Sequence, residues 1–121
     1  MSKRRNNMAK DDYEVIVYQI LAYLYQCLKK DMDIEEQYLK PQGKLFDINT
    51  KYWQFIIYNL VKDGLIEGGV LNKVWGEKYP LIEELENMNI TTKGIQFLTD
   101  NSFIQKAKEM LKDAKSIVPF V

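Results

Sequence analysis

The segment 13–30 carries apolar side chains around most of a helix rather than along a single stripe. One set of these side chains recurs at helical spacing, at Tyr13, Ile16, Val17, Ile20, Leu24, Cys27 and Leu28. More apolar residues lie on the flanks of this stripe, at Val15, Tyr18, Ala22, Tyr23 and Tyr25. A helix that is apolar on several sides has to be covered on several sides. The segment is therefore predicted to be either the central helix of one core or a dimer interface.

The bounds of this helix and the state of its cysteine follow from local patterns. Asp11 and Glu14 have the spacing of a capping box, which predicts that the helix begins at Asp11 and runs to about Lys30. Cys27 is the only cysteine, so an internal disulfide and a thiolate metal cluster are both excluded. We expect a buried thiol, with an interchain bridge as the alternative.

Length and composition indicate one domain. The chain has 121 residues, 46% of them apolar and 28% charged, which suffices for a single hydrophobic core. The longest apolar run, 15–28, is interrupted by Gln19 and Gln26 and is shorter than the ~20 residues of a transmembrane helix. No apolar signal region follows the basic N-terminus, so a cytoplasmic protein is expected. We expect a basic, flexible arm over residues 1–10 and one domain over 11–121.

Two further helices are expected before the middle of the chain. A short helix fits within 34–39, before Pro41 and Gly43 break the chain. Asn49 is a good N-cap for a third helix that runs to Asp63, and Gly64 then ends it. One face of this helix is apolar, at Trp53, Ile56, Ile57 and Leu60.

A hairpin and two more helices are expected in the second half. Leu65, Ile66, Val70 and Leu71 are typical of a strand, with Gly68 and Gly69 allowing a bulge, and a partner strand is expected between Leu81 and Ile90. The connection through Asn72, Gly76 and Pro80 would form the tip of a wing. The next helix is expected to be capped by Thr91, with Ile90 and Ile95 as a hydrophobic staple, and the last to open at Asn101 or Ser102 and to end at Pro119. The expected buried stripe of that last helix is Phe103, Ile104, Ala107, Met110, Leu111 and Ala114.

This order of elements predicts an α+β fold of the winged helix-turn-helix type, with three helices, a two-stranded wing and additional C-terminal helices. Helical folds without a wing remain the alternative.

Two stretches carry a family resemblance. The runs YWQFIIYNLVKDGLIEGGV, from Tyr52, and NITTKGIQFLTDNSFIQKAKEMLKDAK, from Asn89, resemble the YjcQ family of small proteins from low-GC Gram-positive bacteria and their phages. The similarity extends over roughly Tyr13 to Val118. It implies a winged-helix-like fold and frequent location in prophages. It implies no established activity, and it brings no catalytic motif to this chain.

The residue types present argue against an enzyme. The chain has no histidine, which excludes histidine bases, Ser-His-Asp and Cys-His systems and every histidine-containing metal site. The carboxylates at 35–36 and 83–86 lack the spacing of a Ca²⁺ loop, and the glycines match no nucleotide-binding motif. We therefore expect no catalytic residue, no cofactor, no metal and no small-molecule substrate.

The third helix holds the candidate binding residues. If it were a recognition helix, it would present Lys51, Gln54, Phe55, Tyr58, Asn59 and Lys62. This set contains no arginine and few side chains that can form two hydrogen bonds with the edge of one base. Its aromatic members could also anchor a protein interface.

The charges are distributed against a strong DNA binder. Residues 11–121 carry 13 basic and 17 acidic side chains, so the body has a net charge of −4. The wing is also acidic, whereas duplex-binding surfaces are normally basic. The remaining basic residues lie in the arm, at Lys3, Arg4, Arg5 and Lys10, which could enter a minor groove or be a solvated tail. Translation from Met8 would remove three of these four charges.

Two functions are compatible with these observations. The first is a non-enzymatic winged-helix module of phage or prophage origin that acts as a DNA-associated regulator. The alternative is a protein-interaction or phage-assembly module, as a homodimer or with another partner, that does not bind DNA. A membrane partner is not expected.

Overall fold

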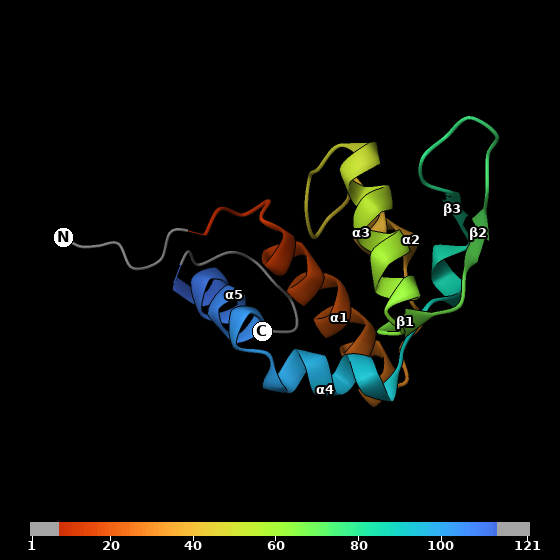
Figure 1. Cartoon of the computed structure of the whole chain (residues 1–121). Coiled ribbons are helices and arrows are strands. Elements are labelled where there is room, and N and C mark those ends of the chain that lie inside the picture. The colour runs from red at the N-terminus through yellow and green to blue at the C-terminus, as the bar shows by residue number, and fades with distance from the viewer. Residues whose placement is uncertain (1–7, 114–121) are drawn as a thin grey trace.

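The computed structural model describes residues 8–113, so the expectations for Lys3, Arg4, Arg5, Ala114 and Pro119 lie outside the described residues. The described part is α+β and contains five α-helices, one 3-10 helix and four short strands (Figure 1). The helices are α1 (Tyr13–Lys30), α2 (Glu36–Leu39), α3 (Thr50–Lys62), α4 (Thr92–Asp100) and α5 (Ser102–Asp113). The strands are β1 (Ile66–Glu67), β2 (Val70–Asn72), β3 (Leu81–Glu83) and β4 (Asn89–Ile90), and the 3-10 helix η1 is Leu85–Asn87. No helix in this described part is long and apolar enough to cross a bilayer.

Helix α1 is the central element of the core. It packs against α4, α5 and β4, and α3 lies on the side of α1 opposite α5 (Figure 1). Its side chains are buried almost continuously from Val15 to Leu21, and Cys27 is buried as expected. The wide apolar surface read from the sequence is thus covered within one chain, which is the central-helix alternative. Leu28, which the helical spacing placed in the stripe, is 55% exposed, so its expected place in the stripe is wrong.

The capping box expected at Asp11 is wrong. The N-cap residue is Asp12, and its carboxylate accepts a hydrogen bond from the backbone N–H of Ala9 at 2.9 Å instead of capping the helix. The preceding turn therefore takes the carboxylate that the first turn of the helix would otherwise use.

Three other caps are confirmed. The side chain of Asn49 accepts a hydrogen bond from the Tyr52 N–H, and Thr91 accepts one from the Gly94 N–H. The side chain of Asn101 accepts hydrogen bonds from the first turn of α5. Each of these side chains satisfies backbone donors that a helix start leaves unpaired.

The expected hairpin is present, but its ladder is divided. β1 pairs antiparallel with β4, and β2 pairs antiparallel with β3, as two separate two-stranded sheets. In the first arm of the hairpin, β1 and β2 are separated by Gly68 and Gly69, which have positive φ. In the returning arm, β3 and β4 are separated by η1. A Cβ on Gly68 would lie 2.0 Å from the Asn87 carbonyl oxygen, so the close approach of η1 requires glycine there.

The stripe of α5 is confirmed except at one described position. Ile104, Ala107, Met110 and Leu111 are buried, whereas Phe103 is 56% exposed. Phe103 lies in the first turn of α5, and the Lys106 ammonium stands 5.5 Å from its ring centroid. Its expected burial is therefore wrong, because the stripe that is covered begins one residue later.

Candidate interaction surface on the third helix and the hairpin

Helix α3 is held on the core by one face. Trp53, Ile56, Ile57 and Leu60 are buried there, which confirms the expected apolar face. The Trp53 indole N–H donates a hydrogen bond to the Leu39 carbonyl oxygen at 2.8 Å. Because a buried indole N–H needs an acceptor, this bond fixes the orientation of the ring. The opposite side of α3 faces away from the core. There Gln54, Phe55 and Tyr58 contact the hairpin.

Two polar members of the candidate set bind within the chain. The Gln54 side-chain amide donates to the Pro80 carbonyl oxygen at 3.2 Å, and the Asn59 amide donates to the Phe55 carbonyl oxygen at 2.8 Å. These are the two side chains of the set with the amide geometry for reading an adenine edge. A base contact would have to compete with both internal bonds.

The aromatic members form a cluster with residues from other elements. The Phe55 ring has its centroid 6.1 Å from that of Tyr13 and 5.7 Å from that of Tyr79, in both cases edge-on. The Tyr58 ring lies 5.9 Å from Tyr79. We call Tyr13, Phe55, Tyr58 and Tyr79 the aromatic cluster. It joins α1, α3 and the returning arm of the hairpin, so it has a structural role whatever else it contacts.

The remaining members of the candidate set are cations. Lys51 and Lys62 are exposed near opposite ends of α3. The structure thus brings Gln54, Phe55 and Tyr58 together against the hairpin and leaves the two lysines in solvent. Their assignment to a DNA or protein interface stays a prediction.

The hairpin tip, residues 73–80, carries the most exposed aromatic side chain of the described chain. Trp75 is 98% exposed, and the neighbouring Val74 is 40% exposed. Gly76, with φ of 86°, closes the turn, in which the Glu77 N–H donates to the Val74 carbonyl oxygen. In Figure 1 the loop between β2 and β3 forms the end of the molecule away from α5.

Sequence reasoning missed Trp75 because only the turn-forming residues of this connection, Asn72, Gly76 and Pro80, entered the prediction. The available signal was the pair Val74–Trp75, the only two apolar neighbours between Asn72 and Tyr79. A tryptophan in a turn has few ways of being buried by its own chain, and here none is used.

The electrostatics of this surface are simple. Burial, followed by the nearby carboxylates of Asp63 and Glu14, raises the pKa of the Tyr13 hydroxyl, so Tyr13 is uncharged near neutral pH. At the tip, Lys73 and Lys78 flank Glu77, and the Lys78 ammonium lies 5.7 Å from the Tyr79 ring centroid. Within residues 8–113 no group of three His, Cys, Asp or Glu side chains could hold a metal ion. The surface offers apolar contact and a few charges.

Fold and surface together define a small α+β protein whose divided hairpin carries an exposed aromatic tip beside a helix. The family model described as YjcQ protein matches residues 18–117, and the chain belongs to this family. Neither the comparison with curated proteins nor that with solved structures found a match.

Proposed function

We propose that the protein is a non-enzymatic interaction domain that docks on a partner protein through its hairpin tip, with Trp75 as the anchor. The observation that carries this proposal is the 98% exposure of the Trp75 side chain. Beside it, the exposed Val74 enlarges the apolar contact area.

Burial of this side chain by a partner would supply much of a binding free energy. An aromatic side chain of this kind buries roughly 150–250 Å². At about 25 cal/mol per Å², that corresponds to roughly 4–6 kcal/mol before the losses of association. Tryptophan is also strongly enriched among the residues that dominate protein interfaces. One apolar pocket on a partner would therefore give Trp75 a large share of the affinity.

The aromatic cluster supports the tip as a docking element. Tyr79 packs on Phe55 and Tyr58, and Gln54 binds the Pro80 carbonyl oxygen, so α3 braces the returning arm of the hairpin. A braced tip loses less conformational freedom on binding than a loose loop does.

DNA association as a winged helix is the second candidate. The order of elements supports it, with α3 in the recognition position and the β2–β3 hairpin as the wing. The exposed cations Lys51 and Lys62 favour it further. Against it stand the acidic balance of residues 8–113, with 13 lysines and 17 carboxylates, and the internal bonds of Gln54 and Asn59. A role in phage assembly or prophage regulation would be served by either mode and rests on the family resemblance alone.

The test is photo-crosslinking from the tip in the native host. A photoreactive phenylalanine derivative replaces Val74 in the full chain, with and without Trp75→Ala. A matched control carries Phe103→Ala, which removes another exposed aromatic side chain, on α5, the helix that lies away from the tip (Figure 1). We expect a discrete crosslinked protein that is lost with Trp75→Ala and kept with Phe103→Ala. The same crosslink in all three chains would refute the anchoring role.

A second measurement separates the DNA alternative. Anisotropy of a labelled duplex is titrated at low and at physiological salt with the wild type, with Trp75→Ala and with Lys51→Glu/Lys62→Glu. Binding at physiological salt that is insensitive to Trp75→Ala and abolished by the lysine changes would make DNA association the leading function.

A further inference from the structure

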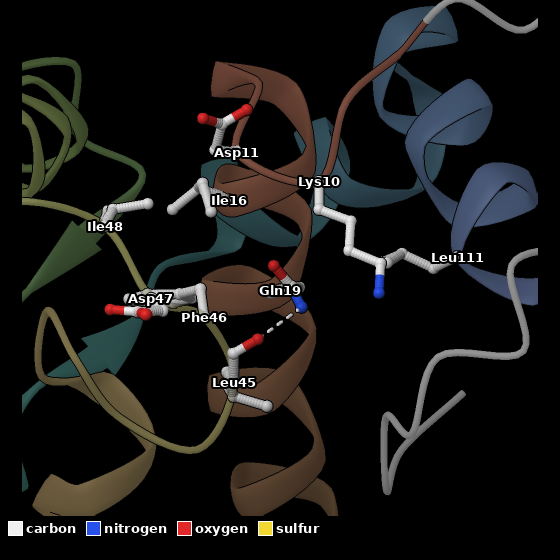
Figure 2. A pocket seen from close by; sticks show the side chains of 9 residues that line it. All are labelled: Lys10, Asp11, Ile16, Gln19, Leu45, Phe46, Asp47, Ile48 and Leu111. Carbon is white, nitrogen blue, oxygen red and sulfur yellow. Dashed lines mark hydrogen bonds between the residues drawn. The ribbon is translucent and has the colours of Figure 1, made fainter.

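A cavity of about 390 Å³ lies against α1, and Figure 2 shows the side chains that line it. It is bounded by α1, by the segment 45–48 that precedes α3, and by the C-terminal half of α5. Its size is within the range of small-molecule sites in proteins. Nothing in the sequence patterns indicated it, because its walls come from three separate parts of the chain.

The walls of this cavity are largely apolar. Ile16 comes from α1, Leu111 from α5, and Leu45, Phe46 and Ile48 from the loop between α2 and α3 (Figure 2). An apolar wall with a few placed polar groups is the usual composition of a site for an organic molecule.

The polar group in the cavity is the side chain of Gln19. It is only 5% exposed and, among the described residues 8–113, is the buried polar residue of a core made of apolar and aromatic side chains and Cys27. Its Nε2 donates a hydrogen bond to the Leu45 carbonyl oxygen at 2.8 Å. Since that carbonyl can only accept, the amide orientation is set by chemistry, with Oε1 on the other side.

Gln19 Oε1 has no hydrogen-bond partner within the described residues 8–113. In Figure 2 this oxygen points away from Leu45, into the space that the labelled side chains surround. Buried acceptors are almost always paired, so an unpaired one requires an explanation. A ligand with an N–H or O–H group directed at Oε1 would supply the missing donor.

The charges at the solvent side of the cavity select among such ligands. Asp11, Asp47 and Lys10 line it and are exposed, giving two carboxylates against one ammonium. This local charge of −1 favours a cation over an anion of similar size.

We propose that the cavity binds a small aromatic amine, with its ring between the apolar walls, a ring N–H donated to Gln19 Oε1, and its ammonium group at the side of Asp11 and Asp47. The site is independent of the docking tip, so Trp75→Ala leaves it intact.

The test uses tryptamine as the probe, with ¹⁵N-labelled full-length protein followed by NMR. We expect saturable shifts of the Gln19 side-chain amide and of the backbone amides of residues 45–48. Two analogues separate the contributions. 1-Methyltryptamine lacks the ring N–H, and indole-3-propionate carries a carboxylate in place of the amine. Each should bind several-fold to about tenfold more weakly, and tenfold corresponds to about 1.4 kcal/mol.

Variants connect these differences to named atoms. In Gln19→Met, tryptamine and 1-methyltryptamine should bind equally, because the acceptor is gone. The matched control is Gln105→Met, which also removes an amide that donates to a backbone carbonyl, that of Leu98, outside the cavity. It should keep the preference for tryptamine. If Gln19→Met does not fold, Asp47→Asn tests the exposed side of the site, where it should weaken tryptamine but not neutral indole.

Four results would overturn the proposal. They are the absence of saturable shifts, shifts centred elsewhere, equal binding of tryptamine and 1-methyltryptamine to the wild type, and equal binding of the amine and the carboxylate. The first would mean that solvent alone satisfies Gln19 Oε1.

Discussion

The ring of Phe55 on α3 meets the ring of Tyr79 on the hairpin edge-on, with centroids 5.7 Å apart and planes at 74°. The two residues are far apart in the sequence, and their contact joins the helix to the returning arm of the hairpin. The Gln54 bond to the Pro80 carbonyl oxygen is a second link at the same place. The position of the tip therefore depends on a few identifiable contacts.

Removing the Tyr79 ring should loosen the hairpin. In Tyr79→Ala the ring contacts with Phe55 and Tyr58 are lost, and each such pair contributes about 0.5–1.5 kcal/mol beyond area burial. We expect the free energy of unfolding to fall by roughly 1–3 kcal/mol in urea titrations, and the amides of β2 and β3 to exchange hydrogen faster. The exposed Lys73→Ala is the control and should change neither. Unchanged exchange in Tyr79→Ala would show that the strand ladder alone holds the hairpin.

Gly94 should not tolerate alanine although it lies in a helix. In an open helix, Gly→Ala stabilises by about 0.5–1 kcal/mol. Here a Cβ would lie 2.1 Å from the Leu65 carbonyl oxygen and 2.8 Å from Ile90 Cγ1, because α4 packs closely on the residue that precedes β1 and on β4. We expect Gly94→Ala to lower the free energy of unfolding by roughly 1–3 kcal/mol. Gln96→Ala, exposed on the same helix, should change it by less than about 0.5 kcal/mol, and a stabilised Gly94→Ala would contradict the close packing.

The hydroxyl of Tyr23 should make stability fall at alkaline pH. Burial raises its pKa to about 12, while the Glu35 N–H donates a hydrogen bond to it at 2.8 Å. An unfolded tyrosine titrates near 10, so the unfolded state loses this proton first as the pH rises. The contribution of Tyr23 is complete below about pH 10 and is lost between about pH 10 and 12. Its size is at most about 2–3 kcal/mol.

Urea titrations at about pH 9 and about pH 11.5 would measure this loss in the wild type and in Tyr23→Phe. The phenylalanine variant should lose less stability between the two values. Other buried tyrosines titrate in both proteins, so the difference reports on Tyr23. Identical losses would mean that the Tyr23 hydroxyl is solvated.

The two tryptophans should respond in opposite ways to quenching and to substitution. Trp53 is 4% exposed and hydrogen-bonded to Leu39, whereas Trp75 is almost fully exposed. Acrylamide should quench the fluorescence of Trp53→Phe, which keeps Trp75, far more than that of Trp75→Phe. Trp53→Phe should also lose roughly 1–3 kcal/mol of unfolding free energy, because the buried Leu39 carbonyl loses its donor. Trp75→Phe should stay within about 0.5 kcal/mol of the wild type. Strong quenching of both variants would show that Trp53 is accessible.

Much of the helical structure could be predicted because its signals are local. Asn49, Thr91 and Asn101 cap helices through backbone N–H groups two or three residues ahead, so each pattern contains both partners. The apolar spacing of 13–30 required cover on several sides, and the capping error at Asp11 arose because a nearby turn competed for the neighbouring carboxylate.

The candidate site depended on contacts that the sequence could not specify. The sequence could not show whether Phe55 and Tyr58 contact a partner or the chain itself. In the structure both rings contact Tyr79, which lies on the returning arm of the hairpin. The exposure of Trp75 and the division of the ladder at Gly68 likewise follow from how the hairpin folds over its neighbours.

The sequence by itself determined an α+β chain, a first helix that is apolar on several sides, three of the helix caps, a glycine-permitted bulge in the hairpin and the absence of histidine chemistry. Only the tertiary structure decided which aromatic side chains remain in solvent and that the Gln19 side-chain oxygen has no partner among the described residues. The physical reason is the distance along the chain over which each interaction acts. Caps and periodicity act within one or two helical turns, whereas burial and hydrogen-bond satisfaction are settled by groups that meet across the fold.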